Sequence, residues 1–569
     1  MKSRKRLLLQ EFSYVGVFAL VIALIFVLPF LVKGNLVYGD DLEYQLSRIK
    51  EITGWLKDGV FNFPGISTRS FYSLGYGVNI FYPWATLLPF SVFGLWINNP
   101  VIAIYLGFYV YTFGTVLIAY YCMKRFSRSW VASIAFSILY TFSTYRSIDG
   151  FTRFALAEFI ALTFLPLIML GSYEVLFGQK RYWVIVTIGF SLIVYTHVLT
   201  AFLACLYLFI FWGISLFFIN ERVKRSLVLF FSGIVAIFAS AGYLFGFVEE
   251  QIFQSFLQPS PMDLIGTNVN QLILSSLYND FMRSSQNGTY NVGLICILIL
   301  IIGVFFWKAM NTTYRIIYGL GIVTLFMTTN LFPWSLVQGT PLGVIQFPFR
   351  LLVFPTLFAC ITGANLIKIF SEKYSMKIKS SVLVATLFIC VVPWSLSANA
   401  MLIKAQPFKF DSNNIFFTDS DNRFSMWIDQ YMPEASQKHV NEIYQHVGYL
   451  ENNTFVASPR TDKQSLIFKI PADRNYMEID LPIIRYKNTT VFVNGKNVPI
   501  TSSYRGTVQL IIDKGMNSIK IEYQVSSAMK LGFLVSIATW ILLIIYFFEV
   551  TIKKKEPRII SSNSAKKKN

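Results

Sequence analysis

Acidic residues cluster directly after the first apolar stretch of the chain. Segment 37–48 holds Asp40, Asp41 and Glu43. Carboxylates this close together at a membrane exit repel one another, so they are expected where water, a cation or an acceptor hydroxyl uses them. A carboxylate in such a position can take a proton from a hydroxyl group. Adjacent Asp residues are also good helix caps, because they accept free backbone amides in the first turn. Both interpretations stay open.

A second polar cluster occupies segment 145–158, where Asp149, Arg153 and Glu158 stand among apolar residues. Glu158 falls inside a predicted membrane span, where a charge needs a partner or a water-filled cavity. Arg153 and Asp149 are close enough in sequence to supply that partner. An internal ion pair is therefore the alternative to a substrate site.

Two further segments add a histidine and an arginine. His197 lies in an apolar block, where a hydrogen-bonded structural histidine is the simpler interpretation. Segment 345–350 ends on Arg350 after Pro348, which blocks helix continuation and leaves the guanidinium at headgroup depth. A planar guanidinium pairs two phosphate oxygens at once, so Arg350 is a candidate phosphate clamp, with snorkelling to the headgroups as the alternative.

Acids for proton transfer or metal binding, combined with arginines for phosphate, are typical of a site that handles a lipid-linked phosphate donor. No glycine-rich phosphate loop of the GxxxxGK[ST] or GxGxxG type follows a strand in the sequence. The sequence therefore disfavours a mechanism driven by ATP or a nucleotide sugar.

Composition indicates the elements that must position these side chains. Of the 569 residues, 54% are hydrophobic and 14% are charged, whereas soluble proteins carry about 25% charged residues. Apolar blocks of about 20 residues match the thickness of a bilayer. The five cysteines lie in apolar blocks without metal spacing, so neither a disulfide framework nor a zinc site is indicated. We predict an α-helical polytopic membrane protein with about twelve transmembrane helices, near 12–32, 101–123, 130–146, 155–177, 183–199, 201–219, 226–247, 291–307, 315–331, 350–369, 381–397 and 530–548.

Basic residues in the short loops predict the orientation, because cytoplasmic loops collect Lys and Arg. These basic residues all fall on one side of the membrane, and both termini are cytoplasmic, if segment 81–96 does not cross the membrane. That segment contains Pro83 and Pro89, so we predict a re-entrant or interfacial piece at the outer face. The cytoplasmic segments then hold the whole excess of 49 basic over 30 acidic residues. The charge is a topology signal and indicates no nucleic-acid partner, although the tail 550–569 is expected to contact anionic membrane lipids.

Three outward segments are too long to be simple connections. Two are the loops 33–100 and 249–290 of a transmembrane domain spanning 1–397. The third is an extracytoplasmic β-rich domain at 398–528, which precedes a last transmembrane helix at 529–549. Alternating stretches and the hairpin signal Asn494-Gly495 predict a small β-sandwich there. Aromatic residues leading into it are either its core or a surface that stacks on sugar faces; they are Trp427, Tyr431, Tyr444 and Tyr449.

The order and outward placement of these pieces resemble the GT-C superfamily of polytopic glycosyltransferases. More closely, the chain resembles the YfhO-like bacterial membrane proteins, which often carry the label of a 6-pyruvoyl-tetrahydropterin-synthase-related domain. The resemblance covers about residues 1–435. It rests on Asp40-Asp41 with Tyr44-Gln45-Leu46-Ser47-Arg48-Ile49, Gly75-Tyr76-Gly77 with Phe81-Tyr82-Pro83, Tyr145-Arg146 with Arg153 and Glu158, Thr196-His197, Gln346-Phe347-Pro348-Phe349-Arg350, and Gln430-Tyr431-Met432-Pro433.

The resemblance implies transfer of a sugar from a polyprenyl phosphate to an envelope acceptor, such as a teichoic acid or another surface glycan. It implies Asp40 or Asp41 as the catalytic base. It assigns the donor phosphate to Arg350, with Arg146 or Arg153. Further site candidates are Glu43, Gln45, Arg48, His197 and Gln346.

Some superfamily members hold a divalent cation, Mg²⁺ or Mn²⁺, in the second acidic loop. By resemblance its ligands here are Asp41, Asp149 and Glu158. One departure bears on this: relatives usually have His where this chain has Gln45, which is a poor metal ligand and neither an acid nor a base. The pterin-synthase part of the label has no support, because no histidine cluster for a zinc site is present.

The alternative function is a transporter or flippase for a lipid-linked sugar. Such proteins usually show internal repeats and interrupted helices at mid-membrane. Here the charged residues gather toward one face and the inner halves of the spans are apolar, which favours the enzyme. A scaffold that only displays the β-domain leaves both acidic clusters unexplained.

Overall fold

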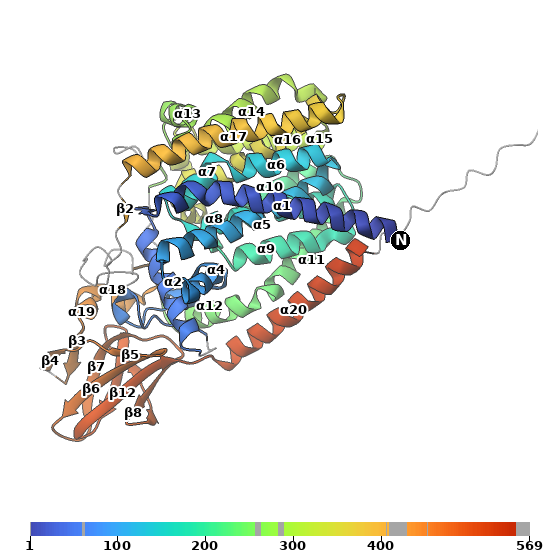
Figure 1. Ribbon diagram of the computed structural model, residues 1–569. Helices are drawn as coiled ribbons and strands as arrows, with labels where there is room; N and C mark the ends of the chain where they lie inside the picture. The colour runs from blue at the N-terminus through green and yellow to red at the C-terminus, as the bar shows by residue number, and fades with distance from the viewer. Residues whose placement is uncertain are drawn as a thin grey trace, which may run out of the picture.

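A bundle of helices with a β region at one end makes up the molecule (Figure 1). The computed structural model describes residues 2–59, 63–256, 263–282, 290–405, 407–408, 429–451 and 453–552. The predicted basic tail lies outside this part of the chain apart from its first three residues, and Trp427 also lies outside it. In Figure 1 the β region and the first residues of α1 lie at opposite ends of the molecule.

Seven helices in the described part are long and apolar enough to cross a membrane. Each predicted span contains a helix, but the helices in four of the blocks have 12 to 16 residues, fewer than the roughly 20 that span a bilayer. The count of twelve crossings therefore stays a prediction. The seven are α1 (Lys2–Lys33, its apolar part from Gln10), α5 (Pro100–Ser127), α8 (Leu156–Leu176), α10 (Val198–Ser215), α16 (Val353–Ser371) with the turn before it, α17 (Met376–Lys404) and α20 (Ser527–Ile552). The four shorter ones are α6 (Trp130–Thr141), α9 (Trp183–Val194), α14 (Gly293–Phe305) and α15 (Thr312–Met327).

The predicted span at 226–247 contains a pair of helices, α11 (Arg222–Ala239) and α12 (Ala241–Phe253), bent by 75°. A break inside an apolar segment frees backbone groups, which need partners in the absence of water. α20 supplies them: Ser536 Oγ donates to the carbonyl of Ala239 at 2.6 Å, and Trp540 Nε1 donates to the same oxygen at 3.0 Å. The sequence did not predict this bend, because the groups that stabilise it come from a distant part of the chain, and the crossing itself stays a prediction.

The loop 33–100, predicted to be the first outer loop and called so below, is built of short helices. They are α2 (Leu42–Lys57), η1 (Phe71–Ser73), α3 (Val78–Phe81), η2 (Ala85–Leu87) and α4 (Leu88–Trp96). At the break after α3, Arg48 donates to the carbonyls of Tyr82 and Pro83 at 3.1 and 2.7 Å. The nine residues of α4 rise only about 14 Å, well short of the roughly 30 Å of a bilayer core.

The β region has two five-stranded antiparallel sheets, ordered β10-β11-β7-β3-β4 and β5-β6-β12-β8-β9. Alternating apolar side chains from both sheets form one core that includes Phe468, Leu481 and Ile519. The predicted hairpin at Asn494-Gly495 joins β8 to β9 with both residues at positive φ. The strands are β3 (Val447–Leu450), β4 (Asn453–Val456), β5 (Arg460–Asp462), β6 (Ser465–Ala472), β7 (Met477–Ile484), β8 (Thr489–Val493), β9 (Lys496–Val498), β10 (Thr501–Ser502), β11 (Thr507–Ile512) and β12 (Gly515–Tyr523).

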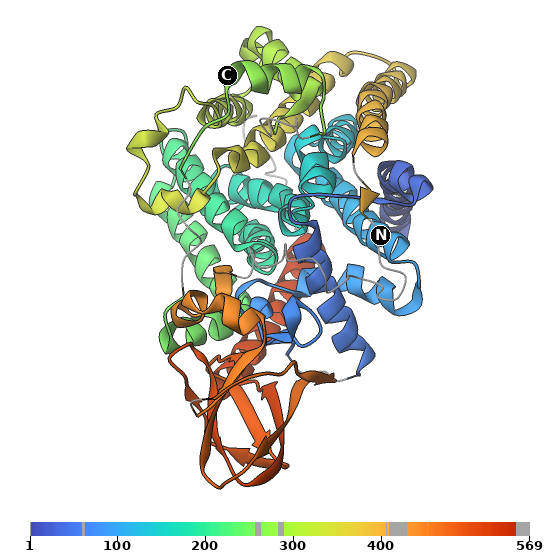
Figure 2. The same cartoon turned by 90° about the vertical axis from the view of Figure 1, so that its left-hand side faces the viewer.

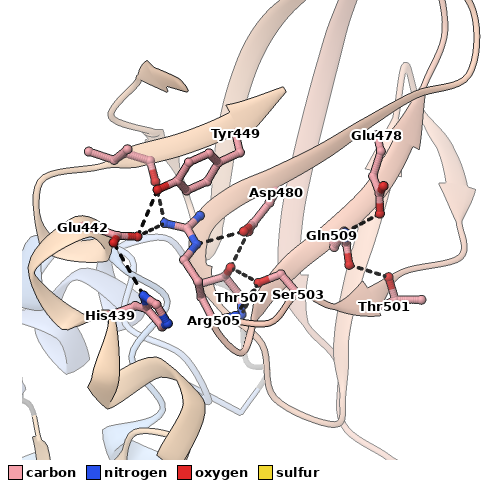
Figure 3. Close-up of polar contacts among 11 residues, drawn as sticks. His439, Glu442, Tyr449, Glu478, Asp480, Thr501, Ser503, Arg505, Thr507 and Gln509 are labelled. Carbon is pink, nitrogen blue, oxygen red and sulfur yellow. Dashed lines mark hydrogen bonds and ion pairs between the residues drawn. The ribbon is translucent and has the colours of Figure 1, made fainter. Parts of the chain in front are cut away.

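A buried arginine ties the short helices α18 (Glu434–Lys438) and α19 (Val440–Tyr444) to these strands. Arg505 is fully buried and donates to Asp480 and to the carbonyl of Val447, both at 2.9 Å. Its Nη1 also lies 3.5 Å from Glu442 of α19 (Figure 3). Because a buried charge needs several partners, this network fixes the segment that follows Tyr431 against the sheet.

The first outer loop packs against the C-terminal region, as the neighbouring blue and orange segments in Figure 2 show. A Cβ at Gly77 would lie 2.6 Å from the ring of Tyr486, so only glycine permits this approach. The amide of Gly77 donates to Tyr486 Oη at 2.9 Å, and that hydroxyl donates to the carbonyl of Tyr431, also at 2.9 Å. A second link is the short β1 (Leu36–Val37), which pairs with β2 (Pro407–Phe408).

Candidate functional site

Charged side chains from three distant parts of the chain meet at the end of the bundle that faces the β region. Asp41 directly precedes α2, and its backbone amide donates to the carbonyl of Arg153 at 2.8 Å. Asp149 lies in a π-helical turn, Ile148–Thr152, and Glu158 in the first turn of α8. Arg350 lies in the 3₁₀ turn Pro348–Leu352 before α16.

Arg153 forms a buried ion pair with both acids of the second cluster. Its Nη1 lies 2.6 Å from Asp149 Oδ1 and 2.7 Å from Glu158 Oε2. Tyr145 donates to the other oxygen of Glu158 at 2.9 Å. All of these side chains are buried. The internal ion pair that the spacing allowed is present, so two carboxylates already share the positive charge of Arg153.

Asp41 is half-buried and stands at the helix N-cap position without making a side-chain cap bond. The capping interpretation of Asp41 is therefore not realised. Burial raises the pKa of its carboxyl group above the ordinary 3.8; Arg153 and Arg350 oppose the rise, whereas Asp40 and Glu158 add to it. A carboxylate held in this way is a stronger base than a free aspartate.

The other two acids of the first cluster make different contacts. Asp40 is exposed and accepts a short hydrogen bond from Tyr290. Glu43 accepts a hydrogen bond from Tyr38 at 3.0 Å. The three carboxylates that neighbour one another in sequence thus lie in separate environments.

Arg350 differs from Arg153 in its partners. Its Nη1 donates to the side chain of Gln346 at 2.7 Å and to the carbonyl of Ile345 at 3.1 Å. Its Nε is buried without a hydrogen-bond partner in the described part of the chain. No carboxylate among those residues lies within ion-pair distance of it. Gln346, with φ 59°, holds a backbone conformation that L residues rarely adopt and that is often found at functional sites.

His197 lies beside the same charges. Its Nδ1 is 2.7 Å from Thr200 Oγ1, and its ring centroid is 6.0 Å from that of Tyr82. Burial lowers the pKa of His197 to about 4; Glu158 opposes this shift, and Arg350 and Arg153 add to it. The imidazole is therefore neutral at physiological pH and serves as a hydrogen-bonding group.

The remaining candidates lie outside this cluster or support it. Arg146 is fully buried, donates to Thr112 and Thr115 at 3.2 Å, and stacks on the rings of Phe26 and Phe159. It is not brought to Arg350.

Gln45 and Arg48 lie in α2, and their side chains are 3.4 Å apart. Arg48 holds the turn at Tyr82 and Pro83 and stacks on the Tyr82 ring at 4.1 Å. Arg48 therefore fixes the turn that follows α3.

The structure adds aromatic residues that the sequence did not single out for this place. The guanidinium of Arg153 lies 5.6 Å from the ring centroid of Tyr290 and 5.0 Å from that of Phe349. Tyr431 stacks on Phe81 with centroids 5.6 Å apart. Burial raises the pKa of Tyr431 to about 12; Arg48 and Arg350 oppose the rise, and Asp41 adds to it.

Tyr431 thus stands within electrostatic range of Asp41 and Arg350. From the sequence we expected Tyr431 in a sugar-stacking surface or in the core of the β-rich domain. The available signal for the site was its place in the segment Gln430-Tyr431-Met432-Pro433.

Within the described ranges, no group of three or more His, Cys, Asp or Glu side chains is arranged to hold a metal ion. Asp149 and Glu158 converge on the guanidinium of Arg153 instead. The proposed ligand set of Asp41, Asp149 and Glu158 does not fit a divalent cation in this geometry.

The fold and this cluster define a polytopic α-helical membrane protein with a buried polar site at the end of the helix bundle that faces the β region. The chain belongs to the family described as 6-pyruvoyl-tetrahydropterin synthase related domain, membrane protein, whose model matches residues 81–405. That range includes Arg153, Glu158, His197 and Arg350, whereas Asp41 precedes it. A search of curated proteins found no match.

Proposed function

We propose that this protein is a GT-C-type membrane glycosyltransferase. It moves a sugar from a polyprenyl-phosphate donor to an envelope acceptor, a teichoic acid or another surface glycan, at the outer face of the membrane. One observation carries the proposal: the backbone amide of Asp41 donates to the carbonyl of Arg153 at 2.8 Å, and the charges of Arg153 and Arg350 both act on the Asp41 carboxyl group. A base and a phosphate-binding cation are the two groups that transfer from a glycosyl phosphate needs.

In the proposed reaction, Asp41 takes the proton of the acceptor hydroxyl. The hydroxyl oxygen attacks the anomeric carbon from the face opposite the phosphate, and the bond between that carbon and the phosphate oxygen breaks. The bonding electrons leave with polyprenyl phosphate, and the configuration at the anomeric carbon is inverted. Arg350 stabilises the charge that grows on the leaving phosphate.

Arg350 suits the phosphate better than the other two arginines. Two carboxylates engage Arg153, and Arg146 is enclosed by threonines and aromatic rings. Arg350 is held by a carbonyl and an amide oxygen, which orient the guanidinium without neutralising it. Arg153 is a positioning residue in this scheme, because it holds the backbone of Asp41 and the two inner acids.

Reconstitution tests the proposal against a flippase for a lipid-linked sugar. Purified protein in nanodiscs is incubated with a polyprenyl-phosphate sugar and candidate acceptor glycans, and free polyprenyl phosphate is measured. A glycosyltransferase releases polyprenyl phosphate only when an acceptor is present. A flippase releases none, and instead equilibrates the intact lipid between the leaflets of proteoliposomes. The second pattern would replace the proposal.

A further inference from the structure

A hollow on the surface of the helix bundle lies between α10 and α11, at the end away from the polar site. α10 starts next to His197 in the site, so its last turn lies at the opposite end. The hollow has a volume of about 660 Å³, which is within the usual size of small-molecule sites. Its walls include Phe209, Trp212, Leu216, Leu227 and Phe230.

The hollow exists because two consecutive helices diverge. α10 packs on α8 and α9, and α11 packs on α8, α9 and α20, but α10 and α11 make little contact with each other. Trp212 Nε1 donates to Ser226 Oγ at 2.8 Å across the gap. Phe209, Leu227 and Phe230 are 68%, 61% and 69% exposed. In a membrane these apolar side chains face the lipid hydrocarbon, so the walls of the hollow suit an acyl chain.

The end of the hollow at Arg222 and Val223 carries basic residues. A second hollow of about 510 Å³ is lined by 219–224 and adjoins the first, since Arg222 and Val223 line both. Lys180 and Lys224 pair with Glu221 at 2.7 and 3.5 Å. Arg222 is exposed, and no side chain or carbonyl in the described residues pairs with its guanidinium. Basic residues therefore outnumber acidic residues at this end of the hollow.

We propose that the hollow between α10 and α11 binds an anionic phospholipid. One acyl chain lies in the hollow, and the phosphate lies between Arg222 and Lys224. The guanidinium of Arg222 can pair two oxygens of the phosphate. A zwitterionic lipid fits less well, because its own ammonium group approaches the same basic residues. The inference is independent of the proposed enzymatic function, since it concerns the opposite end of the bundle.

Fluorescence quenching tests the proposal in nanodiscs of phosphatidylcholine. Either brominated phosphatidylglycerol or brominated phosphatidylcholine is added at the same low mole fraction, and quenching of tryptophan fluorescence is measured. The difference between wild type and Trp212→Phe gives the share of quenching that arises at Trp212. We expect brominated phosphatidylglycerol to quench this share several-fold more strongly. The double variant Arg222→Gln/Lys224→Gln should abolish the preference. Lys373→Gln/Lys377→Gln, which changes exposed lysines at the same end of the bundle, should retain it.

Native mass spectrometry of the same variants gives a readout that does not depend on Trp212. Wild type should retain phosphatidylglycerol in preference to phosphatidylcholine, and the Arg222→Gln/Lys224→Gln variant should lose that preference. Equal quenching by both lipids, quenching by neither, or a preference that survives the double variant would overturn the proposal and leave ordinary annular lipid at this surface.

Discussion

The guanidinium of Arg153 lies 2.7 Å from the carboxylate of Glu158, and both side chains are buried at the junction between the outer loops and the helix bundle. Asp149 shares the same guanidinium nitrogen at 2.6 Å. A buried pair of this kind contributes little net stability when it is intact, but removing one partner leaves a buried charge uncompensated. Arg153 therefore maintains the architecture on which the site depends.

Arg153→Met should lower the free energy of unfolding by about 3–5 kcal/mol, because Asp149 and Glu158 lose their shared cation. Thermal unfolding of the purified protein in detergent measures the loss. Adding Glu158→Gln to Arg153→Met should recover part of it, since one buried charge is removed. A Tm of Arg153→Met equal to wild type would show that water already solvates these acids.

Arg350→Gln should reduce sugar transfer by about 100- to 1,000-fold, the usual effect of removing one group that stabilises transition-state charge. Arg350→Lys should fall between this variant and wild type, because it keeps the charge but loses the planar two-point contact. The assay is initial-rate release of polyprenyl phosphate. If Arg350→Lys and wild type have equal rates, the phosphate is not bound through two guanidinium nitrogens.

The raised pKa of Asp41 has a consequence for stability. Because the folded state binds this proton more tightly than the unfolded state, stability falls as pH rises from 3.8 through the folded pKa. Above that window an ionised Asp41 costs free energy that a neutral residue does not. Asp41→Asn should therefore raise the Tm at pH 7.5, and the gain should shrink as pH falls.

The same shift predicts the pH dependence of activity. Transfer should decline as pH falls through the raised pKa of Asp41, because the protonated carboxyl group is no longer a base. The inflection should lie above 3.8, the ordinary pKa of an aspartate. His197 should add no inflection near neutral pH, because its pKa lies at about 4. A rate that stays constant as pH falls to 4 would contradict the assignment of Asp41 as base.

Chelation should leave the activity intact. The two acids that the resemblance implied as metal ligands bind Arg153, and no metal-binding group of three side chains is found among the residues the structure covers. Transfer rates with and without EDTA should agree. An EDTA-sensitive rate that Mg²⁺ or Mn²⁺ restores would show that the acids rearrange around a cation.

Local patterns in the sequence predicted the parts of the site that depend on neighbouring residues. Apolar blocks located the helices, and the spacing of Asp149, Arg153 and Glu158 allowed the ion pair that is found. The hairpin at Asn494-Gly495 followed from its turn residues. These features need only a few adjacent residues to form.

Other features depend on contacts between segments that are far apart in sequence. At the bend between α11 and α12, the carbonyl of Ala239 accepts hydrogen bonds from Ser536 and Trp540 of α20. Tyr431 reaches the site because Tyr486 holds its carbonyl and Gly77 leaves room for Tyr486. Arg146 and Arg153 are the same residue type seven positions apart, and only the fold distinguishes the enclosed arginine from the one beside Asp41.

In the proposed reaction, Asp41 removes the proton of the acceptor hydroxyl. This role is tested by measuring the release of polyprenyl phosphate by purified wild type, Asp41→Asn and Asp40→Asn in nanodiscs with donor and acceptor supplied. Asp41→Asn should lose about 100- to 10,000-fold in rate, the range for a general base, with an unchanged or higher Tm. Asp40→Asn, whose side chain is exposed and bonded to Tyr290, should retain most of the activity. Wild-type rates in a folded Asp41→Asn variant would contradict the account.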